Sequence, residues 1–249
     1  MKPDDLHLGG LRPGSSVEII AGGDVPEIAA ELTRQAIQEP DYEWGPTRAS
    51  GWVGDAVWRN STPDPIEFFT SKWIVPPAPA KESGQILYIF SALTLPGDVG
   101  IVQPVLQWGV VRSVWSVSSW YALNTSFGPR SWISKPTAVE VGAALIGWIK
   151  LTQKDAKGLT YKWGFEGIPS TEVQLAGLPE LRSSYVALEA FRVFDCDNFP
   201  ETEKTTFSEI VLRTTKGIVS PTWKAESKIV SCGQHVVTSA AGTVDIFYR

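Results

Sequence analysis

The chain has 249 residues, a formal net charge of −5 and an apolar fraction of 43%. A chain of this length and composition can bury a full core in one domain without a metal ion. It shows no cluster of Lys and Arg of the kind that binds nucleic acid. It also lacks a run of about 18 apolar residues that could span a membrane. We therefore expect neither nucleic acid nor a membrane as a partner, and the sequence leaves the oligomeric state open.

The first 24 residues are rich in Gly and Pro and indicate irregular structure. Asp24 can cap a short helix over residues 25–38, which Pro40 ends. We expect an irregular and helical arm over residues 1–45 and a main domain over 46–249. The start at Met1 lacks the basic and then apolar pattern of a secretion signal, so the protein either stays inside the cell or has lost a leader.

From Gly51 onward, short apolar or alternating runs are separated by turn residues, which is typical of strands. About eleven strands without a strong helix predict an all-β fold, with two antiparallel sheets packed as a sandwich. The expected strands cover residues 51–58, 68–75, 85–93, 101–111, 114–122, 139–151, 159–165, 185–194, 206–213, 228–238 and 243–248.

The two cysteines, Cys196 and Cys232, each lie beside an expected strand. They could form a disulfide across neighbouring strands or remain as two reduced thiols, and the sequence does not decide between these. The segment from Asp195 to Asn198 offers oxygen atoms that could hold calcium. Asp and Asn also cluster in turns for local hydrogen-bonding reasons, and we favour the turn.

Nucleophilic and metal-dependent catalysis have little support. The chain contains only two histidines, His7 and His235, and no nucleophile elbow. His and Cys together are too few for a zinc site. We therefore expect no metal and no cofactor.

Two polar residues interrupt otherwise apolar strands, Gln107 and Glu189. Side chains alternate between the faces of a strand, so Glu189 shares a face with Tyr185, Ala187, Phe191 and Val193. A carboxylate among apolar neighbours is costly, which should raise its pKa and makes it a candidate for proton transfer. An amide facing it could donate to a developing oxyanion, and Gly109 would leave room above that amide. The alternative is that both residues are solvated on an exposed sheet face.

Five segments, in chain order, resemble motifs of the glutamic peptidases, the eqolisin family. Gly51–Val57 is similar to the family's Asn-Trp-Ala-Gly-Ala strand, and Val105–Gly109 is similar to its Ile-Leu-Gln-Thr-Gly strand with the catalytic Gln. The other three are Phe69–Pro76, Ser119–Tyr121 and Val186–Ala190. The last of these stands where the family carries its catalytic Glu.

The resemblance implies a concanavalin A-like, jelly-roll sandwich with a Gln/Glu dyad on a concave sheet. In that scheme Glu189 is the general base and then the general acid, and Gln107 orients the water and stabilises the oxyanion. Trp52, Ser119, Tyr121 and Tyr185 would bind the substrate.

Three functions remain open. The first is a glutamic-peptidase-like hydrolase that acts on a peptide. The second is a small-molecule enzyme on the same scaffold, a dehydratase or cyclase (pericyclase-like) with an apolar substrate in a Trp-rich groove. The third is a non-catalytic, lectin-like binding module in which exposed Trp side chains stack on sugar rings.

Overall fold

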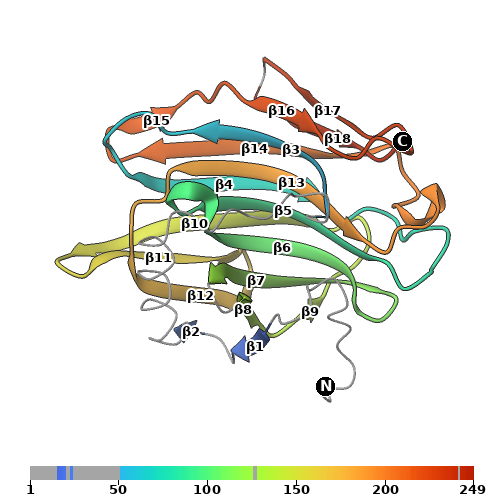
Figure 1. Cartoon of the computed structure of the whole chain (residues 1–249), viewed down its shortest axis with the longest axis horizontal. Helices are drawn as coiled ribbons and strands as arrows, with labels where there is room; N and C mark the ends of the chain where they lie inside the picture. Colours follow the sequence, from blue (N-terminus) through green and yellow to red (C-terminus); the bar gives the residue numbers. More distant parts are fainter. Residues whose placement is uncertain (1–15, 21–22, 25–50, 126–127, 241) are drawn as a thin grey trace.

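Two β-sheets packed face to face make up nearly all of the described chain (Figure 1). The structure is a computed structural model, and it describes residues 16–20, 23–24, 51–125, 128–240 and 242–249. The predicted all-β, two-sheet sandwich is confirmed.

The first sheet has nine strands. From edge to edge it consists of β1 (Ser16–Ile20), β8 (Gly128–Ser134), β7 (Val114–Thr125), β6 (Gly100–Val111), β5 (Ile86–Thr94), β13 (Ser183–Phe191), β3 (Trp52–Arg59) and β16 (Lys224–Ser227), and β9 (Thr137–Ala138) pairs with β7.

The second sheet also has nine strands. It consists of β17 (His235–Thr238), β18 (Val244–Phe247), β14 (Lys204–Thr214), β4 (Ile66–Ile74), β10 (Ala144–Asp155), β11 (Gly158–Phe165), β12 (Ile168–Leu178) and β2 (Gly23–Asp24), and β15 (Gly217–Val219) pairs with β14. Strand pairing is antiparallel throughout the described chain, except that β1 and β2 pair in parallel with β8 and β12.

The strands differ from the expected ones in several places, and the short strands β9, β15 and β16 were also not expected. Residues 16–20 and 23–24, expected to be irregular, add a strand to the edge of each sheet. β8 and β12 were not expected, because polar side chains dilute their apolar pattern and their formation depends on pairing with β7 and β11. The strand expected over 228–238 exists only as β17, from His235 to Thr238. The helix predicted over 25–38 lies outside the described residues.

The core lies between the two sheets. Leu106 and Leu188 of the first sheet pack with Phe69, Trp73 and Trp163 of the second in one buried cluster. Strand alternation accounts for this arrangement, because every second residue of β6 and β13 points to the other sheet. The remaining residues of these strands form a second buried cluster on the opposite face, which we call the outer face of the first sheet.

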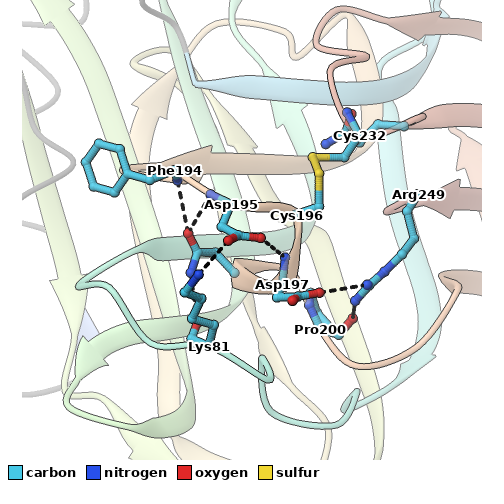
Figure 2. The surroundings of a disulfide bond; sticks show 10 residues. Lys81, Phe194, Asp195, Cys196, Asp197, Pro200, Cys232 and Arg249 are labelled. Carbon is cyan, nitrogen blue, oxygen red and sulfur yellow. Dashed lines mark hydrogen bonds and ion pairs between the residues drawn. A yellow bond between two sulfur atoms is a disulfide. The ribbon is translucent and has the colours of Figure 1, made fainter.

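A disulfide joins Cys196 to Cys232 and resolves the alternative that the sequence left open. Figure 2 shows this bond beside a turn in which Asp195 and Asp197 each form an ion pair with a basic side chain. Asp195 caps the 3₁₀ helix η3 (Cys196–Asn198) and pairs with Lys81 at 2.6 Å. Asp197 pairs with Arg249 at 3.1 Å. The carboxylates therefore stabilise a turn, as the favoured alternative predicted, and they also form ion pairs.

A second 3₁₀ helix, η2 (Pro96–Asp98), links β5 to β6. Across the described ranges, no helix is long and apolar enough to cross a membrane.

The disulfide generates the first testable prediction. It closes a loop with a sequence separation of 36 residues, and loss of such a constraint typically lowers the free energy of unfolding by about 2–4 kcal/mol. We expect the double variant Cys196→Ala/Cys232→Ala to show this loss in urea denaturation. The wild-type protein should lose as much when it is fully reduced, whereas the double variant should not respond to reductant. An unchanged free energy of unfolding in fully reduced wild-type protein would contradict the prediction.

Candidate active site

Gln107 and Glu189 lie in one row across the first sheet. Gln107 on β6 is in register with Tyr88 on β5, and Tyr88 is in register with Glu189 on β13. Register partners on adjacent strands point to the same face. Leu106 and Leu188 pack between the sheets, so the row faces the outer side. With a strand spacing of about 4.8 Å, the backbones of β6 and β13 lie about 10 Å apart.

The Gln107 amide is fully buried and fully hydrogen-bonded. Its Nε2 donates to Ser116 Oγ at 3.3 Å and to Ser118 Oγ at 3.1 Å. Its Oε1 accepts a hydrogen bond from Trp120 Nε1 at 3.0 Å. The indole N–H can only donate, so this contact fixes which end of the amide is oxygen. Both amide hydrogens are therefore already committed to serine hydroxyls.

Tyr88 occupies the position between the two members of the expected dyad. Its ring packs edge-on against Trp120 and Phe191, with centroid separations of 5.4 and 6.1 Å. Its hydroxyl is buried and has no hydrogen-bond partner among the described residues. Burial, and then the negative charge of Glu189, raise the pKa of the Tyr88 hydroxyl far above its usual range. Tyr88 therefore remains protonated.

Glu189 is half-buried and has Trp52 of β3 opposite it on its other side. The Trp52 ring makes edge contacts with Phe90 at 5.6 Å and Tyr185 at 5.4 Å. Trp52, Tyr185, Gln107 and Glu189 are therefore brought to the same face. Val193, which was expected to share this face, does not lie on it. The strand β13 ends at Phe191, and Val193 packs against the inter-sheet core.

Tyr185 is held at one end of the outer face by charged groups. Its hydroxyl accepts a hydrogen bond from Arg59 Nη2 at 3.0 Å and donates to Asp98 Oδ2 at 3.3 Å. Asp98 also accepts a hydrogen bond from Thr94 Oγ1 at 2.6 Å. Burial, and then the charge of Asp98, raise the pKa of Tyr185. The Tyr185 hydroxyl is thus neutral and makes two hydrogen bonds.

Ser119 and Tyr121 lie on the other face of the sheet, away from Gln107. Tyr121 belongs to the inter-sheet core and stacks on Trp132 at 5.6 Å. Ser119 is fully buried, and its backbone N–H donates to Ser134 Oγ at 2.9 Å. The residue of this motif that reaches the outer face is Trp120, since strand alternation places neighbours on opposite faces. The structure therefore does not bring Ser119 or Tyr121 to the dyad.

Gly109 serves a different purpose from the expected one. It has φ +81°, and a Cβ built on it would lie 2.2 Å from the carbonyl oxygen of Gln85. The residue must be glycine because the backbone turns there and approaches a neighbouring strand closely. Space above the Gln107 amide plays no part in this requirement.

A second carboxylate, Asp55, shares the outer face. Asp55 is in register with Ala187, two residues from Glu189 on the same face of β13. Its side chain is 1% exposed and pairs with Lys228 at 2.6 Å. The Lys228 ammonium also lies 4.7 Å above the Trp52 ring. Burial raises the pKa of Asp55, although Lys228 acts in the opposite direction.

Several of these residues are not predicted from the sequence. In the sequence, Tyr88 is one aromatic residue within an apolar strand. Only strand pairing places it between Gln107 and Glu189. Asp55 stands in the Gly51–Val57 motif where the resembled family has Ala, which is a signal that could have identified it. Lys228 and the serines around Gln107 carry no such signal.

The tryptophans mostly fill the interior. Trp52 and Trp120 lie on the outer face. The fully buried Trp73, Trp115 and Trp163 pack between the sheets. Among the residues that the structure describes, the expected Trp-rich groove is thus represented by two rings on this face.

Comparison with known proteins supports the fold. No protein-family model and no curated protein matches the sequence. Among solved structures, the chain is similar to SCP-B, a member of the eqolisin family of peptidases solved with the tripeptide Ala-Ile-His, with 14% identity and a TM-score of 0.52 over 80% of this chain and 98% of that one. It is also similar to scytalido-glutamic peptidase with a transition-state analogue inhibitor, with 13% identity, a TM-score of 0.50 and the same coverage. The chain therefore has the concanavalin A-like fold of these peptidases.

The buried Asp55 predicts an unusual dependence of stability on pH. Its pKa is raised in the folded protein, so the unfolded chain releases this proton at lower pH. The contribution of this carboxyl to stability is therefore complete when the pH is below its ordinary pKa of about 3.9. It is lost as the pH rises through the higher pKa of the folded state. We expect Asp55→Asn to gain stability relative to wild type as the pH rises over this window, measured by urea denaturation.

Glu226 provides a matched control, because it lies in register with Asp55 on β16 and its pKa is lowered, chiefly by a hydrogen bond from Lys224. Glu226→Gln should lose stability relative to wild type as the pH rises. A relative stability of Asp55→Asn that falls with pH would mean that attraction to Lys228 outweighs burial.

The hydrogen bonds of Gln107 generate a third prediction. Gln107→Leu leaves the buried Trp120 N–H and the Ser116 and Ser118 hydroxyls without their amide partner, and we expect a loss of about 1–3 kcal/mol in the free energy of unfolding. Gln107→Glu, measured at pH 3–4, keeps an oxygen acceptor for Trp120 and should lose less. Equal losses in the two variants would show that these hydrogen bonds contribute little.

Proposed function

We propose that the outer face of the first sheet hydrolyses an amide bond of a peptide substrate, with Glu189 as the acid–base group and Gln107 as its partner. The observation that carries the proposal is the row of Gln107, Tyr88 and Glu189 on adjacent strands. This row combines one half-buried carboxyl with hydrogen-bonding groups in otherwise apolar surroundings. The fold shared with eqolisin peptidases supports it.

In the reaction, Glu189 takes a proton from a water molecule while the water oxygen attacks the carbonyl carbon. The carbonyl oxygen becomes an oxyanion in the tetrahedral intermediate. Glu189 then returns the proton to the amide nitrogen, the C–N bond breaks, and a carboxylic acid and an amine leave. No other co-reactant than water is needed.

Gln107 would orient the water and stabilise the oxyanion in this scheme. Both hydrogens of its amide are held by serine hydroxyls in the structure, so either role requires one serine to give up its bond. The binding of substrate is assigned to Trp52 and Tyr185, which reach the outer face. Ser119 and Tyr121 have no part in it, since they point to the interior.

The disulfide bears on where this reaction would take place. Stable structural disulfides form and persist mainly in oxidising compartments. The Cys196–Cys232 bond therefore favours a protein that works outside the reducing cytosol.

A second candidate is a small-molecule dehydratase or cyclase, favoured by the enclosure of the row. Gln107 is 0% exposed, and the Tyr88 hydroxyl is buried. Closed, mostly apolar surroundings with a few polar groups are typical of small-ligand sites. Glu189 in its protonated form would then protonate a leaving hydroxyl group.

The test of the first candidate is cleavage of acid-unfolded casein by the wild-type protein and by Glu189→Gln. The amide side chain cannot accept the proton from water, so we expect a loss of activity of about 10²–10⁴-fold. Glu172→Gln is the matched control, because Glu172 lies on the second sheet in an ion pair with Lys162 and should leave the activity unchanged. Full activity of Glu189→Gln would refute the hydrolase proposal. Wild-type protein that does not cleave casein at any pH from 3 to 7 would favour the second candidate.

A further inference from the structure

An oxyanion in this site needs a hydrogen-bond donor that is not already engaged. The Gln107 amide does not meet that need, because both of its N–H groups donate to Ser116 and Ser118. Trp120 Nε1 is likewise engaged with Gln107 Oε1. A substrate oxygen would have to displace one of these bonds before either group could stabilise it, and the energy gained would be reduced accordingly.

Tyr88 carries a donor that is not engaged. Its hydroxyl is buried and has no hydrogen-bond partner in the part of the chain that the structure describes. A buried polar group without a partner normally costs stability, so such a group in a native protein calls for an explanation. Storage of a donor for a reaction is one such explanation, because the group then gains its bond only when charge develops on the substrate.

The position of Tyr88 fits this use. It is in register with Glu189 on one side and with Gln107 on the other, so its side chain lies between them on the outer face. Directly opposed residues on antiparallel strands have Cβ atoms about 4.5–5.5 Å apart. A water activated by Glu189 would therefore attack a carbonyl close to the Tyr88 side chain.

The surroundings of Tyr88 also keep its proton in place. The edge contacts with Trp120 and Phe191 fix the ring. Burial and the adjacent charge of Glu189 raise the pKa of the hydroxyl, so it is neutral and able to donate over the whole range in which Glu189 can act. In water-excluded surroundings a fixed donor stabilises an oxyanion more than it would in water.

We propose that Tyr88 is a catalytic residue whose hydroxyl donates the hydrogen bond that stabilises the oxyanion of the tetrahedral intermediate. This inference rests on the proposed amide hydrolysis and assigns to Tyr88 the oxyanion role that the family resemblance gives to Gln107. The hydroxyl keeps its proton throughout, while Glu189 alone transfers protons. Gln107 then acts as a positioning residue that holds Trp120 against the Tyr88 ring.

The decisive variant is Tyr88→Phe, compared with Tyr161→Phe as a matched control. Both are buried tyrosines, but the Tyr161 hydroxyl donates to the Ile66 carbonyl at 2.7 Å in the second sheet, remote from the outer face. The measurements are kcat and KM for acid-unfolded casein and the Tm of each variant.

We expect opposite results for the two variants. Tyr88→Phe loses no hydrogen bond of the free protein, so its Tm should be unchanged or raised, while kcat falls about 10²–10³-fold. Tyr161→Phe leaves a buried carbonyl without its partner, so its Tm should fall by about 2–6 °C with kcat unchanged. A purely structural role of Tyr88 would instead lower Tm and leave kcat unaffected.

Binding of a peptide aldehyde supplies a readout that does not depend on turnover, because its hydrate resembles the tetrahedral intermediate. By calorimetry, Tyr88→Phe should bind it about tenfold or more weakly than wild type, and Tyr161→Phe should bind it equally well.

The outcomes separate the two proposals. Loss of activity in Glu189→Gln together with full kcat and full aldehyde affinity in Tyr88→Phe would overturn the role of Tyr88 and leave the hydrolase proposal standing. Full activity in Glu189→Gln, or wild-type protein that neither cleaves casein nor binds the aldehyde, would overturn both.

Discussion

The pairing register of β6, β5 and β13 is the constraint on which the candidate site depends. Because side chains alternate along a strand, a slip of one residue between any two of these strands would move a member of the row into the inter-sheet core. The register is held by that core, where Leu106 and Leu188 pack against the second sheet. Packing between the sheets thus sets the position of the polar groups on the opposite face.

Hydrogen bonds are unequally distributed along the row. Gln107 is surrounded by groups that match each of its donors and its acceptor, and this stabilises its position. Tyr88, its neighbour in the row, has a buried hydroxyl for which the described residues supply no partner. The row therefore places one open donor, the Tyr88 hydroxyl, next to an amide whose hydrogen-bonding groups are all matched.

The edge of the first sheet next to Glu189 is tied to the C-terminal part of the chain. Lys228 follows β16 and reaches the buried carboxylate of Asp55, while it also lies over the Trp52 ring. Cys232, four residues farther along, is joined to Cys196. The disulfide therefore helps to hold in place the segment that supplies Lys228.

The sequence alone predicted the all-β class and the two-sheet arrangement, because both follow from local alternation and turn residues. It could not determine that Gln107 and Glu189 face the same side, which depends on the pairing of β6 and β13 with β5. Nor could it determine which residues lie between or beside these two. Tyr88 and Asp55 take their places only through pairing with strands far away in the chain, and Lys228 takes its place through the fold of the C-terminal segment. Alternation also separates Trp120 from its neighbours Ser119 and Tyr121, but which of the two sets faces the core was decided by the packing of the sheets.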